Sequence, residues 1–190
     1  EIVLVELDPM MIDLAKNHQT LKKYNSKVFQ SKKVNVIVAD AFSWLKQSRQ
    51  KFDAIFIDFP YPNNYELSRL FSKEFYTVVN HNLSEVGFII LNAPISFEFE
   101  NFEGHRLEPT ATLINTLTQS GFHSVFPFGA KEPFIYAEKK QRKIAFDYQK
   151  LPPHLSNSSF VNLAPIGEVL KMSPGTGVNS IFKPKKVVTW

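Results

Sequence analysis

Three short, largely apolar runs that each end at an acidic residue constrain the fold of this chain most. They close within two residues of Glu6, Asp40 and Asp58. An apolar run of four or five residues is typical of a strand buried on both faces, as in a parallel sheet. Between the runs, apolar residues recur at the three- and four-residue spacing of amphipathic helices. This alternation predicts an α/β protein with a doubly wound, mostly parallel sheet.

Turn and cap residues set the expected bounds of each element. Asp8 before Pro9 is a typical helix start, with Asp8 as the cap. Gly121 is a typical helix end. The tight link at 129–132 predicts an antiparallel hairpin. We expect strands at 2–5, 34–38, 54–57, 88–91, 122–128 and 134–136, and helices at 9–23, from 42, at 67–78 and from 109.

This order of elements predicts a Rossmann-like fold of the class I methyltransferase type. We expect a mostly parallel sheet with an antiparallel edge strand and an antiparallel C-terminal hairpin. Residues 1–139 are predicted to form the nucleoside-binding catalytic domain. Residues 140–190, in which periodicity fades and Pro, Ser and Asn dominate, are predicted to form an irregular extension packed on it.

Composition excludes several classes of protein. The chain has 190 residues, enough for one sizeable core, and no cysteine for disulfides or thiolate metal sites. Its longest apolar run is strand-sized, far short of the ~20 residues of a membrane span. The net charge of +4 comes largely from basic runs at 139–143 and 183–186. We interpret these runs as solvated surface, and expect neither nucleic-acid nor membrane binding.

The three acidic residues are predicted to share a ligand-binding edge. In an open α/β sheet the carboxyl ends of the parallel strands face one crevice. A carboxylate there can accept hydrogen bonds from both ribose hydroxyls, and one at the next strand end can accept from an adenine amino group. The backbone N–H near Ala41 can meet a ring nitrogen. Asp58, on a loop stiffened by Pro60 and Pro62, is interpreted either as a catalytic or binding group or as the cap of a turn or of the helix that follows.

The motifs at these positions resemble those of the aminopropyltransferases, the spermidine synthase family. The resemblance is carried by VELDP at 5–9, ADAF at 39–42, FDAIFID-x-P-x-P at 52–62, LSRLFSKEFY at 67–76, GFIILNAPISF at 87–97 and PFGAKEPFIYA at 127–137. It covers about residues 2–138 and is similar to the long bacterial members. It implies transfer of an aminopropyl group from decarboxylated S-adenosylmethionine to an amine such as putrescine.

The resemblance also implies roles for individual residues. Glu6 would hold the ribose, with Asp8 in the same nucleoside site, and Asp40 and Ala41 would hold the adenine. Asp58 would bind the amine and accept its proton. The resemblance further implies a cytoplasmic homodimer. The five histidines show no ligand spacing, so we expect no metal.

Two departures from the family pattern leave other functions open. Tyr61 stands where family members carry a second Asp in the amine site, and a phenol offers a hydrogen bond or a π-face without charge. This favours, as an alternative, an S-adenosylmethionine-dependent transferase with a non-diamine acceptor. A second alternative is a catalytically inactive module that retains the fold for binding or assembly.

The second departure concerns the family's glycine-rich nucleotide loop and first strand, which would precede Glu1 and are absent from this sequence. That strand would lie in the middle of the sheet, beside the strands at 2–5 and 54–57. Each unmade backbone hydrogen bond there costs ~1–3 kcal/mol. We therefore expect that the chain does not fold alone as written, and that upstream sequence or another chain completes the sheet.

Overall fold

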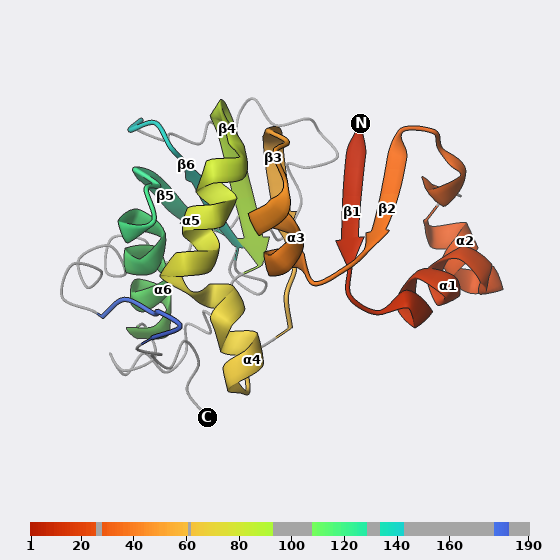
Figure 1. The fold of residues 1–190 in the computed structure, drawn as a ribbon, viewed down its shortest axis with the longest axis horizontal. Helices are drawn as coiled ribbons and strands as arrows, with labels where there is room; N and C mark the ends of the chain where they lie inside the picture. Colours follow the sequence, from red (N-terminus) through yellow and green to blue (C-terminus); the bar gives the residue numbers. More distant parts are fainter. Residues whose placement is uncertain (26–27, 61, 93–107, 129–133, 143–176, 183–190) are drawn as a thin grey trace. The chain divides into compact units, whose positions relative to one another are not determined.

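In the computed structural model, the described residues are 1–25, 28–60, 62–92, 108–128, 134–142 and 177–182 (Figure 1). The chain divides into a first unit, Glu1–Arg49, and a second unit, Gln50–Trp190. Each unit carries its own sheet, with two strands in the first and four in the second. The predicted boundary between a catalytic domain and an extension at 139/140 stays a prediction.

The first unit is a strand–helix–strand–helix segment. Its two strands pair in parallel, from Ile2 opposite Val34 to Glu6 opposite Val38. Asp8 caps the first helix as predicted, because its Oδ1 accepts a hydrogen bond from Met10 N–H at 2.8 Å. The elements are β1 (Ile2–Glu6), α1 (Pro9–Asn17), α2 (Gln19–Tyr24), η1 (Val28–Gln30), β2 (Val34–Val38) and α3 (Ala41–Gln47).

The helix predicted at 9–23 is interrupted at His18, whose backbone is extended (φ −69°, ψ 128°). Asn25 donates from Nδ2 to the Ala15 carbonyl at 2.7 Å, which ties the end of α2 back to α1. Because the expected apolar positions 14 and 21 lie seven residues apart, the spacing fits two short helices as well as one long one. The prediction of a single helix was wrong, because the extended backbone at His18 separates α1 from α2.

The second unit contains a four-stranded sheet in the order β3-β4-β6-β5. The pair β3–β4 is parallel, and β6 runs antiparallel to both of its neighbours. The elements are β3 (Phe52–Ile57), α4 (Tyr65–Ser68), η2 (Arg69–Phe71), α5 (Lys73–Asn82), β4 (Leu83–Asn92), α6 (Glu108–Gln119), β5 (Ser124–Phe128) and β6 (Phe134–Glu138).

The predicted C-terminal hairpin is confirmed, although its link at 129–132 lies outside the described residues. The prediction of an antiparallel strand at the edge of the sheet was wrong. The antiparallel strand is β6, which lies between β4 and β5. The α6 connection carries the chain from β4 past one strand position to β5, and β6 fills that position on its return. This sheet has one parallel pair and two antiparallel pairs, and its mixed α/β arrangement is otherwise the predicted Rossmann-like fold.

The helix predicted at 67–78 is divided into α4, η2 and α5. Ser72 has an extended backbone, and its Oγ accepts from Phe75 N–H at 3.2 Å, so it caps a new helix rather than continuing the previous one. Strand β4 is also longer than predicted. It begins directly after α5, and Leu83 pairs with Phe52 across an irregularity in the β3–β4 ladder.

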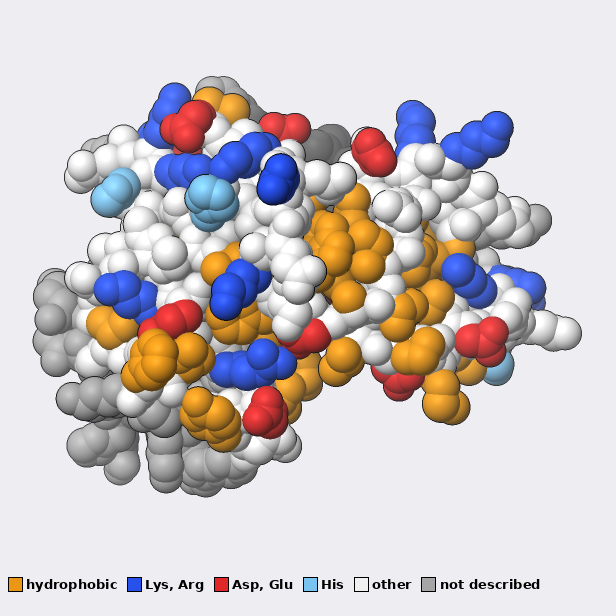
Figure 2. Space-filling model, in the orientation of Figure 1, with side chains coloured by type: hydrophobic (Ala, Val, Ile, Leu, Met, Phe, Trp, Pro, Cys, Tyr) orange, Lys and Arg blue, Asp and Glu red, His pale blue; other side chains and the backbone are white. Residues whose placement is uncertain are grey.

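The main core lies where α5 and α6 cover one face of the second unit's sheet (Figure 1). The buried side chains on these helices and on the facing strands include Phe75, Val79, Leu113, Leu117, Ile89, Leu91, Ile135 and Ala137. In the first unit, by contrast, the hydrophobic side chains classed as buried among the described residues are Ile12 and Leu45. Figure 2 shows hydrophobic side chains on the surface over β1, β2 and α1.

Both sheets have an unpaired side among the described residues, because β1 pairs with β2 alone and β3 with β4 alone. The expectation that a further strand completes the sheet stays a prediction. Within the described part of the chain, no helix has the length and apolar character needed to cross a membrane.

Candidate functional site

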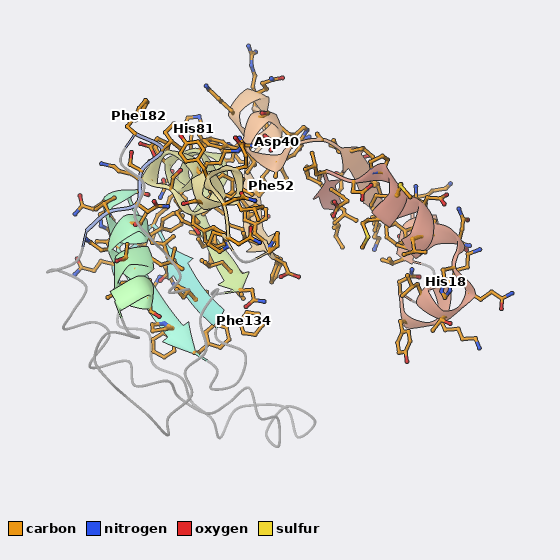
Figure 3. The ribbon with its side chains drawn as sticks, turned by 90° about the horizontal axis from the view of Figure 1, so that it is seen from below. His18, Asp40, Phe52, His81, Phe134 and Phe182 are labelled. Atoms are coloured by element: carbon orange, nitrogen blue, oxygen red, sulfur yellow. The ribbon has the colours of Figure 1, made fainter. Side chains whose placement is uncertain are left out.

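The first unit brings Glu6 and Asp40 to the same end of its sheet, the carboxyl end of its two parallel strands. The parallel register places Glu6 opposite Val38, and the Glu6 carbonyl accepts from Ala39 N–H at 3.0 Å. Asp40 follows directly and caps α3 (Figure 3). The carboxyl ends of two adjacent strands therefore carry one acidic side chain each, as the sequence predicts.

Glu6 and Asp8 together close the turn between β1 and α1. Glu6 Oε1 accepts from Asp8 N–H at 2.8 Å, and Asp8 Oδ1 accepts from Met10 N–H at the same distance. Asp8 thus has a structural task at the start of α1. Its assignment to a nucleoside site stays a prediction.

Asp40 has a similar local task at the start of α3. Its Oδ1 accepts from Ser43 N–H at 2.8 Å, which makes it the cap of the helix. Ala41 is the first residue of this helix, and the N–H groups of a first turn have no acceptor within the helix. An N–H so placed is suited to a ring nitrogen of a base, and Asp40 beside it is suited to an amino group.

Asp58 lies at the carboxyl end of β3, in the second unit. It is exposed and follows Ile57, whose side chain is 6% exposed. Within the described residues, no hydrogen bond or ion pair of the Asp58 side chain is found. The next helix, α4, is capped by Asn64, whose Oδ1 accepts from Leu67 N–H at 2.9 Å. The alternative in which Asp58 caps the following helix is therefore wrong.

Phe59, which sequence reasoning did not select, ties the loop after β3 to the helices. Its ring meets those of Phe71 and Phe75 edge to face, with centroid distances of 6.2 Å and 5.5 Å. The sequence signal that could have identified Phe59 is a large apolar side chain directly after an acidic residue in a proline-containing loop. Such a side chain is expected to pack against the nearby core.

Four predicted site residues, Glu6, Asp8, Asp40 and Ala41, thus lie at one end of the first unit's sheet. Asp58 belongs to the second unit, and its approach to that group stays a prediction. Tyr61 lies outside the described residues. In the described part of the chain no group of three His, Cys, Asp or Glu side chains is placed to hold a metal ion.

Comparison with known families gives one match that covers more than half of the chain. The family described as "Spermine/spermidine synthase domain" matches residues 1–115.

Curated relatives carry the name polyamine aminopropyltransferase. That of Oceanobacillus iheyensis is 36% identical over 152 residues, covering 80% of this chain and 29% of the relative. Enzyme 2 of Aquifex aeolicus is 26% identical over 198 residues, covering 97% and 37%. Enzyme 1 of Streptomyces coelicolor is 38% identical over 96 residues, covering 50% and 18%. The chain thus spans well under half the length of these relatives.

Solved spermidine synthases share the fold. A spermidine synthase in complex with the transition-state analogue AdoDATO aligns with a TM-score of 0.68 and 17% identity, covering 90% of this chain and 61% of that one. The spermidine synthase of Thermotoga maritima aligns with a TM-score of 0.65, also at 17% identity, covering 90% and 60%. At this identity the likeness shows the Rossmann-like fold.

Proposed function

The chain belongs to the spermine/spermidine synthase family, and from that membership we propose that it acts in aminopropyl transfer from decarboxylated S-adenosylmethionine to an amine. The observation that carries the proposal within the chain is the state of Asp58. This carboxylate is exposed at the carboxyl end of β3, directly after the buried Ile57, has no partner among the described residues, and is not the cap of the next helix. A strand-end carboxylate without a structural task is suited to binding a substrate cation.

In the proposed reaction Asp58 is the proton acceptor. An alkylammonium group has no lone pair and must lose a proton before it can attack carbon. A carboxylate within hydrogen-bond reach both orients the ammonium group and takes that proton. The amine nitrogen then bonds to the aminopropyl carbon while the bond from that carbon to sulfur breaks. The sulfonium is a good leaving group, so orientation supplies much of the remaining catalysis.

The nucleoside part of the co-substrate is assigned to the first unit. We propose that Glu6 accepts from the ribose hydroxyls, with Asp8 beside it, and that Asp40 accepts from the adenine amino group. The Ala41 N–H then donates to a ring nitrogen. The two adjacent strand ends that carry Glu6 and Asp40 support this assignment.

The acceptor separates the main proposal from its alternative. The basic run at 139–143, and an uncharged Tyr61 where family members carry a second Asp, favour an S-adenosylmethionine-dependent transferase with a non-diamine acceptor. Calorimetric titrations of the natural protein with methylthioadenosine and with putrescine, done separately, decide between them. Binding of both supports aminopropyl transfer to a diamine. Nucleoside binding without putrescine binding rejects the diamine, and binding of neither favours an inactive module.

The role of Asp58 is tested by Asp58→Asn, which removes the base and keeps the side-chain size. We expect turnover to fall by ~10²-fold or more, because a general base contributes about that much. Asp53→Asn is a matched control: Asp53 is an exposed carboxylate on the same strand, hydrogen-bonded to Ser84 Oγ at 3.1 Å. If Asp58→Asn and Asp53→Asn turn over equally fast, Asp58 is not the base.

The remaining assignments follow from the same proposal. Both proposed substrates are small and water-soluble, which is consistent with a cytoplasmic protein. The family resemblance implies a homodimer, and sedimentation of the natural protein at micromolar concentration checks it. A monomer under those conditions would contradict this assignment.

A further inference from the structure

The loop that carries Asp58 is anchored by one side chain. The half-buried ring of Phe59 lies edge to face against Phe71 and Phe75, at centroid distances of 6.2 Å and 5.5 Å. Both of these partners are 1% exposed, so Phe59 reaches the core of the second unit. The ring of Phe75 in turn lies against that of Tyr76, with a centroid distance of 5.4 Å, and Tyr76 is fully buried.

The backbone that presents these rings is itself held from a distant part of the sequence. Asn179 donates from Nδ2 to the carbonyls of Ser68 and Phe71, at 3.1 and 3.0 Å. Its own carbonyl accepts from Lys73 N–H at 2.7 Å. The segment at 177–182 therefore fixes η2 and the start of α5, on which Phe71 and Phe75 lie.

Asp58 depends on its two neighbours for its position. No hydrogen bond orients its side chain within the described residues, whereas Ile57 before it is buried in the sheet and Phe59 after it is packed against the helices. Fixing both flanking residues confines the backbone of Asp58. In a reaction that depends on orientation, a displacement of ~1 Å can cost ~10²-fold in rate.

We propose that Phe59 is a positioning residue that holds Asp58 in place for proton transfer, through its contacts with Phe71 and Phe75. This inference rests on the proposed function, because it assigns Phe59 a role through the proposed base. The competing explanation is that Phe59 only adds to the stability of the second unit.

A double-mutant cycle with turnover as the readout separates the two explanations. Phe59→Leu keeps an apolar side chain but loses the edge-to-face contacts, and we expect kcat to fall by ~10-fold or more. In an Asp58→Asn background the same change should alter kcat by less than about 2-fold, because the group being positioned is already gone. Methylthioadenosine affinity should not change. Phe59→Tyr, which keeps the ring, should restore most of the turnover.

Phe182→Leu is the matched control, because Phe182 is 86% exposed, points away from the unit (Figure 3) and lies outside the aromatic cluster. A Phe59→Leu enzyme as active as this control would overturn the proposal. So would an equal loss in kcat with and without the Asp58 carboxylate, since that is the pattern of a purely structural role. If Asp58→Asn itself keeps full turnover, the proposed function fails instead.

A measurement that needs no activity decides the inference in that case. Backbone ¹⁵N relaxation of the natural protein gives order parameters for the amides of Asp58 and Phe59. We expect values near those of rigid backbone, about 0.85, to fall toward about 0.6 in Phe59→Leu, while those in β4 stay unchanged. Unchanged order at Asp58, or an equal loss of order in β4, would overturn the positioning role.

Discussion

Replacement of Asn179 by alanine should destabilise the second unit strongly for a single polar residue. The side chain is 1% exposed and donates two hydrogen bonds, to the carbonyls of Ser68 and Phe71. Loss of the buried bond to the Phe71 carbonyl leaves that acceptor without this donor and should cost ~1–3 kcal/mol, and loss of the part-buried bond to the Ser68 carbonyl should cost about 1 kcal/mol. Because the backbone hydrogen bonds of residue 179 remain, we expect a loss of about 2–4 kcal/mol in the free energy of unfolding.

Urea denaturation followed by far-ultraviolet circular dichroism measures this loss. At a slope of ~2 kcal/mol per molar urea, the midpoint should fall by about 1–2 M with an unchanged slope. Asn17→Ala is the control, because Asn17 Nδ2 donates to Asp13 Oδ1 at 2.6 Å on an exposed helix surface. That variant should change the free energy by less than about 0.5 kcal/mol. If Asn179→Ala shows an equally small change, the segment at 177–182 does not hold η2 and α5, and the reasoning fails.

Three further outcomes are expected from single side chains. Burial acts to raise the pKa of Glu74, but hydrogen bonds from Ser180 Oγ and Ile181 N–H outweigh it, and the pKa lies below its usual value of 4.5. A lowered carboxylate pKa stabilises the fold above the unfolded-state pKa, and this stability is lost as pH falls through the folded-state pKa. The urea midpoint should therefore decline as the pH falls below about 4.5, and decline less in Glu74→Gln; equal declines would contradict this. Burial also raises the pKa of Tyr76, whose hydroxyl is buried with no hydrogen-bond partner among the described residues. Tyr76→Phe should be neutral or stabilising by up to about 1 kcal/mol in the same assay, and a loss above that would show that the hydroxyl has a partner. Gly87→Ala should cost ~1–3 kcal/mol, because the new Cβ would lie 2.9 Å from the Phe52 carbonyl oxygen; a midpoint equal to wild type would show that β3 and β4 separate freely.

The site could be predicted from sequence where a local rule decides the structure. Asp8 before Pro9 predicts a helix cap, and the structure has Asp8 accepting from Met10 N–H. The strand ends at Glu6 and Asp40 were predictable for the same reason, since a short apolar run closed by an acid is a local signal. Asp58 was left with two readings, because position alone does not exclude a capping role. The observed cap at Asn64 excludes Asp58 as the cap of the following helix, and a role of Asp58 in capping a turn stays a prediction.

Other features were not predictable because they depend on contacts between distant residues. The break at His18 involves the Asn25 side chain and the Ala15 carbonyl, which the apolar spacing does not register. Asn179 was missed because its partners lie more than a hundred residues away and no local pattern marks them. Phe59 was missed because the partners of a ring in a loop depend on how the loop folds back.

The sequence by itself determined the order of strands and helical regions along the chain, and that each of three strands ends near an acidic residue. Those properties depend on side-chain periodicity and on helix caps, and each of these involves residues only a few positions apart in the sequence. The tertiary structure decided the order β3-β4-β6-β5, the internal place of the antiparallel strand, and the anchoring of the Asp58 loop through Phe59. These depend on which buried surfaces and unpaired backbone groups meet, which is a property of the folded chain as a whole.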